Sequence, residues 1–77
     1  MALITSKKIT KINKNSRVQK ETDCTYNVFN VNENKYIQFD TYGTSERKSE
    51  SKSSQTIQFN RETAEHLIQI LKDEFNL

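Results

Sequence analysis

The sequence contains one cysteine, one histidine and one glycine among its 77 residues, and each shortage excludes a class of protein. The lone Cys24 cannot form an intramolecular disulfide, and with a single histidine it cannot complete a Cys/His zinc cluster. Because Gly43 is the only glycine, the chain has no glycine-rich loop that could cradle a phosphate group. These absences favour a binding module over an enzyme.

Long apolar runs are also missing. No stretch of about 18 apolar residues exists, so the sequence predicts no membrane-spanning segment and no membrane partner. The N-terminal Met-Ala-Leu-Ile precedes Lys7 and Lys8, whereas a signal peptide carries its charge before a longer apolar stretch. A free thiol without such a signal is consistent with a reducing compartment, so we expect a cytoplasmic protein.

Apolar residues are too few for a large core. They make up 32% of the chain, and leucine, isoleucine, valine and phenylalanine together number 18. A chain of this length forms a single domain, residues 1–77. Domains this small bury only about 60% of the surface that the unfolded chain exposes, and they are marginally stable without further support. The simplest support is a second copy of the chain, so composition favours a homodimer.

The net charge of +2 hides an asymmetry. Residues 21–77 carry six bases and ten acids, giving −4, whereas residues 1–20 carry +6 and no acid: Lys7, Lys8, Lys11, Lys14, Arg17 and Lys20. A second basic group lies in the serine-rich residues 44–54 and comprises Arg47, Lys48 and Lys52. Such segments attract phosphate backbones in a salt-dependent and sequence-independent way. A solvated terminal segment without a partner is the alternative.

Hydrophobic periodicity divides the chain into strands followed by one helix. Residues 9–12 give a weak strand signal and Val18 lies in a second, so we expect residues 1–20 to form a basic N-terminal strand or arm. Residues 26–31 alternate clearly, with Tyr26 and Val28 on one face. The following Asn32-Glu33-Asn34 is a turn signal, because asparagine tolerates the left-handed backbone of a tight hairpin.

The strongest strand signal spans residues 36–42, whose side chains alternate between an apolar and a polar face. Residues 44–54 contain no apolar residue and predict an exposed polar loop. Residues 55–59 then return as a strand, with Ile57 and Phe59 facing inward. Together the signals predict an α+β fold, an antiparallel four- to five-stranded sheet followed by one C-terminal amphipathic helix (ββββα).

The helix signal begins at Asn60, whose side chain can cap the first turn. Its apolar residues form one continuous stripe: Ala64, Leu67, Ile68, Leu71 and Phe75. Ile70 lies at the flank of this stripe, and the apolar surface exceeds what one small sheet needs. A dimer contact through Leu67, Ile70 and Leu71 explains the excess, and a wider intramolecular stripe explains it equally well.

No constellation of catalytic residues is found, and the sequence predicts no metal and no cofactor. His66 lies opposite the apolar stripe, where an exposed surface residue is expected and a tuned general base is not. Cys24 has no basic neighbour in sequence that would activate its thiol as a nucleophile. We therefore do not expect an enzyme, because no acid, base and nucleophile converge.

The polar face of the central strands carries aromatic rings. Tyr36, Gln38 and Tyr42 share it, with Tyr26 expected across the hairpin and Lys35 beside them. Single-stranded nucleic acid binds to rings on which bases stack, flanked by cations that follow the backbone. The alternative is that tyrosines simply fit a pleated sheet and pack against their cross-strand neighbours.

The order of elements from Lys35 to Leu71 resembles a known family. It reads as the strand K-Y-I-Q-F-D-T-Y-G, a polar basic loop, the strand Q-T-I-Q-F, and Asn60-Arg61-Glu62 opening a helix. This is similar to the single-stranded-DNA-binding domain of the transcriptional positive cofactor (coactivator) family. In that family the first strand ends in an aromatic pair after a base, whereas here Gly43 replaces one ring and Asp40 the base. The D-T-Y-G and S-Q-x-I-Q strings also resemble small uncharacterised bacterial proteins.

The resemblance implies an antiparallel sheet and a helix-paired homodimer that binds single-stranded nucleic acid, DNA more than RNA, with weak sequence preference. The expected contacts comprise stacking rings and phosphate-neutralising cations: Lys11, Lys14, Arg17, Lys20, Lys35, Tyr36, Tyr42, Arg47, Lys48 and Lys52. A second hypothesis uses the same fold as a protein-interaction, accessory or inhibitor module of a bacterial or phage system. Asp40 and the −4 of residues 21–77 favour this second hypothesis.

Overall fold

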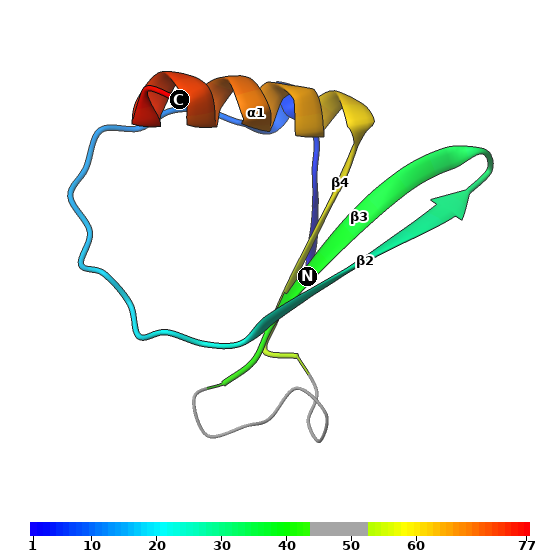
Figure 1. Cartoon of the computed structure of the whole chain (residues 1–77), viewed down its shortest axis with the longest axis horizontal. Coiled ribbons are helices and arrows are strands. Elements are labelled where there is room, and N and C mark those ends of the chain that lie inside the picture. The colour runs from blue at the N-terminus through cyan, green and yellow to red at the C-terminus, as the bar shows by residue number, and fades with distance from the viewer. Residues whose placement is uncertain (44–52) are drawn as a thin grey trace.

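The computed structural model describes residues 1–43 and 53–77. Along the chain its elements are β1 (Ala2–Ile4), the 3₁₀ helix η1 (Ser6–Lys8), β2 (Cys24–Val31), β3 (Asn34–Thr41), β4 (Gln55–Asn60) and α1 (Arg61–Phe75). The strands form one sheet in the order β1-β4-β3-β2, with α1 at one end of it (Figure 1). The predicted α+β class, with four strands before a C-terminal helix, is confirmed.

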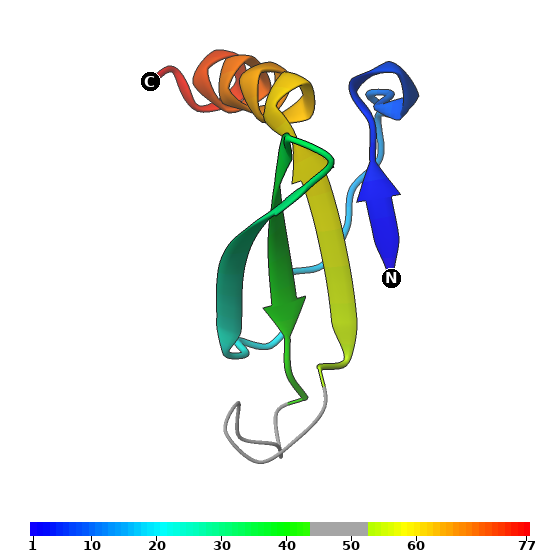
Figure 2. The ribbon, with the colours of Figure 1, turned by 90° about the vertical axis from the view of Figure 1, so that its right-hand side faces the viewer.

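The sheet is mixed, and the prediction of a purely antiparallel sheet is wrong. β3 pairs antiparallel with both β2 and β4, but β1 pairs parallel with β4. Figure 2 shows β1 beside β4 at the edge of the sheet. The prediction failed because residues 2–4, which were not expected to form a strand, pair with the free edge of β4, with Ala2 opposite Ile57 and Ile4 opposite Phe59.

The strands expected at residues 9–12 and around Val18 are absent, because residues 9–23 form no regular secondary structure. Ile9 and Ile12 are three residues apart, so they would point to opposite faces of a strand and could not share a buried side. In their place residues 2–4 supply the edge strand. Residues 44–52 of the expected polar loop, with Arg47, Lys48 and Lys52, lie outside the described residues.

The predicted hairpin is confirmed, with β2 and β3 joined by Asn32 and Glu33. Both turn residues have left-handed backbones, with φ of 50° and 68°. Two consecutive left-handed residues suit the primed turn that matches the twist of the flanking strands. The turn therefore fixes the register, which places Tyr26 opposite Phe39 and Val28 opposite Ile37.

The register gives the sheet two chemically different faces. Directly paired residues project to the same side of a sheet. One side, here called the apolar face, includes Tyr26, Val28, Ile37, Phe39, Ile57 and Phe59. The other, the polar face, includes Tyr36, Gln38, Asp40, Thr56 and Gln58. On the apolar face the ring of Phe39 lies 5.8 Å from the rings of both Tyr26 and Phe59, measured between centroids. The alternation predicted for β3 is confirmed.

The helix is attached to the sheet at its first turn. Asn60 caps it as predicted, because its Oδ1 accepts the backbone N–H of Thr63 at 3.0 Å. Thr63 is fully buried and its hydroxyl donates to the carbonyl oxygen of Ile4 at 3.0 Å. α1 is therefore anchored to both β4 and β1 at one end of the sheet.

The described residues enclose no apolar core. Within residues 1–43 and 53–77, Thr56 and Thr63 are the only buried residues, and no apolar residue joins them. Large apolar residues of the sheet and the helix are more than one third exposed, among them Tyr26, Val28, Ile57, Ile68, Leu71 and Phe75. The apolar face thus lies open on the single chain.

Candidate functional site

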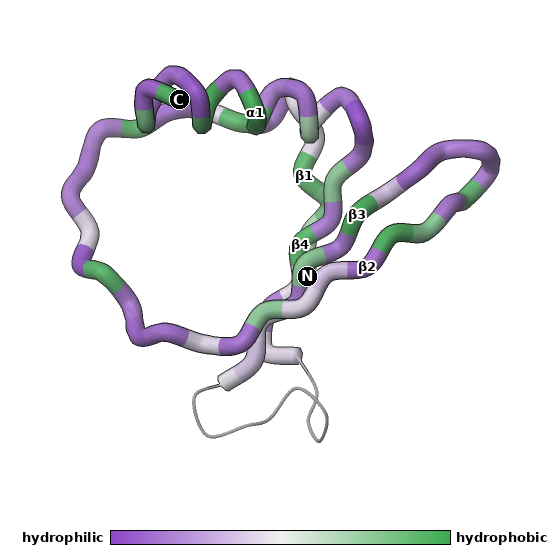
Figure 3. Tube along the Cα trace, viewed as in Figure 1, coloured by the Kyte–Doolittle hydropathy of each residue, from purple (hydrophilic) through white to green (hydrophobic). Residues whose placement is uncertain are grey.

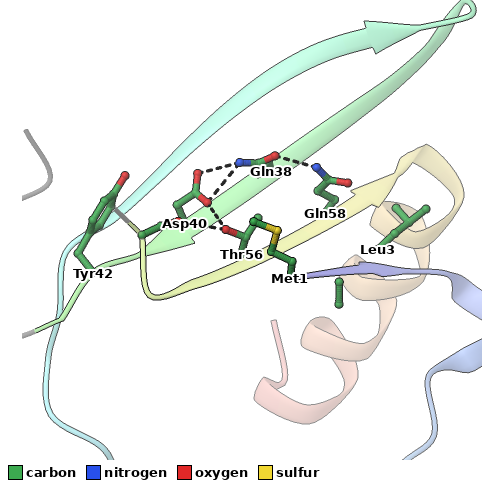
Figure 4. Close-up of a pocket in the computed structure, with 9 residues that line it drawn as sticks. Met1, Leu3, Gln38, Asp40, Tyr42, Thr56 and Gln58 are labelled. Carbon is green, nitrogen blue, oxygen red and sulfur yellow. Dashed lines mark hydrogen bonds between the residues drawn. The ribbon is translucent and has the colours of Figure 1, made fainter. Parts of the chain in front are cut away.

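The polar face carries a row of hydrogen-bonded side chains across β3 and β4. The Nε2 atom of Gln58 donates to Oε1 of Gln38 at 2.8 Å, and Nε2 of Gln38 donates to Oδ2 of Asp40 at 3.0 Å. The hydroxyl of Thr56 donates to Oδ1 of the same carboxylate at 2.5 Å (Figure 4). The register explains the row, because Gln38 pairs with Gln58 and Asp40 with Thr56 across the two strands.

These donors keep Asp40 charged. The hydrogen bonds from Thr56 and Gln38 hold the pKa of the Asp40 carboxyl below its ordinary value, and partial desolvation opposes them only in part. At neutral pH this face therefore carries a negative charge held by neutral donors. A carboxylate in such a setting accepts hydrogen bonds from amino groups and repels phosphates.

A shallow hollow of about 490 Å³ surrounds the row. Met1, which lies just before β1, and Leu3 of β1 form one rim, and Tyr42 forms another (Figure 4). The phenol oxygen of Tyr42 lies within hydrogen-bonding distance of Thr25 Oγ1, at 2.9 Å, which holds the ring beside the start of β2. The hollow therefore combines one aromatic ring, amides and a carboxylate.

The predicted tyrosines are only partly brought together. Tyr36 and Tyr42 flank the polar face at opposite ends of β3, about 20 Å apart at the rise of an extended strand. The Tyr36 ring stacks on Phe29 with centroids 5.8 Å apart. Tyr26 lies on the apolar face opposite Phe39, so its expected place beside Tyr36 is wrong. The reason is the pairing register, which the sequence does not display.

The predicted cations that fall within the described residues lie away from the polar face. Lys35 pairs with Asn30, and strand alternation places it on the opposite side of β3 from Tyr36. Lys14, Arg17 and Lys20 are exposed in the irregular residues 9–23. Lys11 forms an exposed ion pair with Glu74 at 2.9 Å. The structure therefore separates a cationic segment from a polar face that carries one acid.

The helix residues predicted for a dimer contact differ in exposure. Leu67 and Ile70 are half-buried, and Ile70 lines a shallow hollow together with Ile9 and Ile12 of its own chain. Leu71, by contrast, is 48% exposed. Only one of the three predicted contact residues therefore presents a largely open side chain.

His66 is half-buried, and the prediction of an exposed surface histidine is wrong. Its Nδ1 lies 2.9 Å from the hydroxyl oxygen of Ser6 in η1. Sequence reasoning missed this contact because the N-terminal segment folds back beside the helix, 60 residues away in sequence. It also missed Thr56 and Gln58 in the polar row, although Gln58 lies between Ile57 and Phe59, which were predicted to face inward.

Comparison with known proteins gives no further guide to this site. The chain matches no protein-family model, and neither a curated protein nor a solved structure matches it. In the part of the chain that the structure describes, no helix has the length and apolar character needed to cross a bilayer. The similarity to the transcriptional positive cofactor family therefore stays a prediction.

Proposed function

We propose that the protein is a non-catalytic, homodimeric module that binds single-stranded nucleic acid with weak sequence preference. The cationic segment, residues 7–20, supports this most strongly. It holds six bases and no acid, and within the described residues only Lys11 is paired with a carboxylate. Its remaining positive charge is available to a polyanion.

The spacing of these cations favours a linear polymer over a small anion. From Lys8 to Lys20 a base recurs at every third residue. In an extended three-residue-per-turn backbone all would lie on one side, about 9 Å apart. Such a row extends over more than 30 Å at that rise, whereas one phosphate group would contact only one or two of its members.

The polar face complements this segment. Its carboxylate repels phosphates, so bound bases, and not the backbone, would meet Gln38 and Asp40. Carboxylates and amides accept hydrogen bonds from the amino groups of bases. Tyr42 and Tyr36 would stack on bases at the two ends of the strand, which tolerates any base because every base has an aromatic face.

Fluorescence anisotropy with a labelled single-stranded DNA oligonucleotide tests the proposal. The double variant Arg17→Glu/Lys20→Glu should weaken binding roughly tenfold or more, because two phosphate contacts become repulsive. The matched control is Arg61→Glu/Lys72→Glu, which replaces the same residue types and changes the charge equally. Circular dichroism checks that both variants fold. Equal affinity of the two variants, or no binding by the wild type, would contradict the proposal.

A protein-interaction or inhibitor module is the second candidate, and the charged polar face favours it. Asp40 presents a carboxylate there, and residues 21–77 carry −4 in total. A basic protein surface would fit such a face better than a phosphate backbone. Pull-down from a nuclease-treated lysate separates the candidates, because a protein partner survives the treatment and a nucleic-acid bridge does not.

A further inference from the structure

The apolar face of the sheet has no cover in the described part of the chain. On it Tyr26 is 68% exposed, Val28 50% and Ile57 39%. Burying side chains of this size stabilises a protein by about 1.5–3 kcal/mol each. A stable fold cannot leave so much of its small apolar content in water.

The open side of α1 continues this face. Ala64 lines a hollow of about 400 Å³ together with Val28, Ile37 and Phe59. Ile68, Leu71 and Phe75 follow Ala64 at helical spacing, and they are 54%, 48% and 69% exposed. In Figure 3 the apolar segments of α1 lie along its lower side, toward the space beside the sheet. Sheet and helix therefore present one continuous, angled apolar surface.

Within residues 1–43 and 53–77 no segment of the chain covers this surface. The nine residues 44–52 contain no apolar residue. Residues 9–23 contain three large ones, of which Ile12 is 66% and Val18 97% exposed, while Ile9 lies beside Ile70. Figure 1 shows residues 9–23 passing around this side without lying against the sheet. Nothing in residues 1–43 and 53–77 covers this surface, and the apolar-free residues 44–52 are poorly suited to it, which favours a partner molecule.

The exposed area is large enough for a stable interface. The whole chain exposes 7156 Å², whereas a compact monomer of 9.1 kDa exposes about 4,900 Å². Part of this excess of roughly 2,300 Å² belongs to residues outside the apolar surface, among them the irregular residues 9–23. A standard interface buries about 800 Å² per partner, well within the excess.

We infer that a second copy of this chain occupies the surface, with the α1 stripe of each copy lying on the apolar face of the other. The surface is self-complementary, because each copy offers both a projecting stripe and a row of rings. Under a two-fold axis the stripe of each copy contacts the rings of the other, so both contacts form in the same dimer. Leu71 and Phe75 of one copy would pack on Phe39 of the other. The inference rests on the proposed homodimer and assigns its interface.

Light scattering after size exclusion tests the inference with one variant and one control. Wild type should show about twice the monomer mass of 9.1 kDa, and Leu71→Glu should shift it to monomer or unfold it. Val18→Glu introduces the same charge at a site 97% exposed and off this surface, so it should stay dimeric. A wild-type mass of 9.1 kDa, or a dimeric Leu71→Glu variant, would overturn the inference.

Two measurements on wild type keep the test independent of how the variant folds. In a mixture of isotope-labelled and unlabelled copies, filtered nuclear Overhauser spectra should show contacts between Leu71 or Phe75 and the rings of Tyr26 or Phe39. Contacts between two α1 helices alone would overturn the arrangement. The urea midpoint should rise with protein concentration, and a constant midpoint would overturn the dimer. Oligonucleotide binding is measured separately, so failure of the interface is distinguishable from failure of the proposed function.

Discussion

The hydroxyl of Thr63 in α1 donates to the backbone carbonyl of Ile4 in β1, joining residues 59 apart in sequence. Thr63 has no exposed surface, and its backbone N–H is capped by Asn60. One small side chain therefore attaches the helix to the edge strand β1. This strand forms the only parallel pair among the described strands, with β4.

Replacing Thr63 with valine tests this attachment. The two side chains have nearly the same shape, but valine leaves the Ile4 carbonyl without its donor. We expect the free energy of unfolding to fall by about 1–3 kcal/mol in urea denaturation at fixed protein concentration. Thr10→Val, at an exposed position, should change it by less than about 0.5 kcal/mol. Equal effects of the two variants would show that the bond contributes nothing.

Replacing Glu33 with glycine should stabilise the hairpin. Glu33 has φ of 68°, a backbone that costs a residue with a Cβ atom roughly 1–2 kcal/mol and glycine much less. Glycine also loses more conformational entropy on folding. We therefore expect the free energy of unfolding, measured by heat or urea, to rise by up to about 1 kcal/mol. Lys35→Gly, within β3, should instead destabilise the protein. A loss of stability in Glu33→Gly would contradict the turn geometry.

The Asp40 carboxyl should titrate below its ordinary pKa of 3.8. Because its folded pKa is lowered, its stabilising contribution is present above the ordinary value and is lost as pH falls through the folded pKa. A ¹³C carboxyl titration by nuclear magnetic resonance measures this directly. Thr56→Val should raise the pKa toward 3.8, whereas Thr41→Val, on the other face, should leave it lowered. If the Asp40 pKa stays unchanged in Thr56→Val, the hydrogen bond from Thr56 does not cause the lowering of this pKa.

The sequence predicted the elements whose signals are local. Alternation over residues 36–42, the turn at Asn32 and the cap at Asn60 each depend on neighbours in sequence, and all three are found. β1 was missed because three residues carry too short a pattern, and its parallel pairing with β4 joins distant parts of the chain.

The candidate site was less predictable because it depends on register. The row from Gln58 through Gln38 to Asp40 exists only since β3 and β4 pair at that offset. A shift of one residue would have placed Gln58 beside the apolar residues of β3. The register of β2 on β3 likewise placed Tyr26 opposite Phe39 and not on the side of Tyr36. The sequence therefore predicted which residue types face the polar side, but not which side chains lie next to one another across the strands.

The salt dependence of oligonucleotide binding tests the central claim, that the cationic segment binds single-stranded nucleic acid. If four of its cations contact phosphates, the logarithm of affinity should fall with that of salt concentration at a slope of about −3. Anisotropy titrations at about 50 and 200 mM salt should then differ roughly fifty-fold in affinity. Absence of binding at the lower salt, or an affinity independent of salt, would contradict the account.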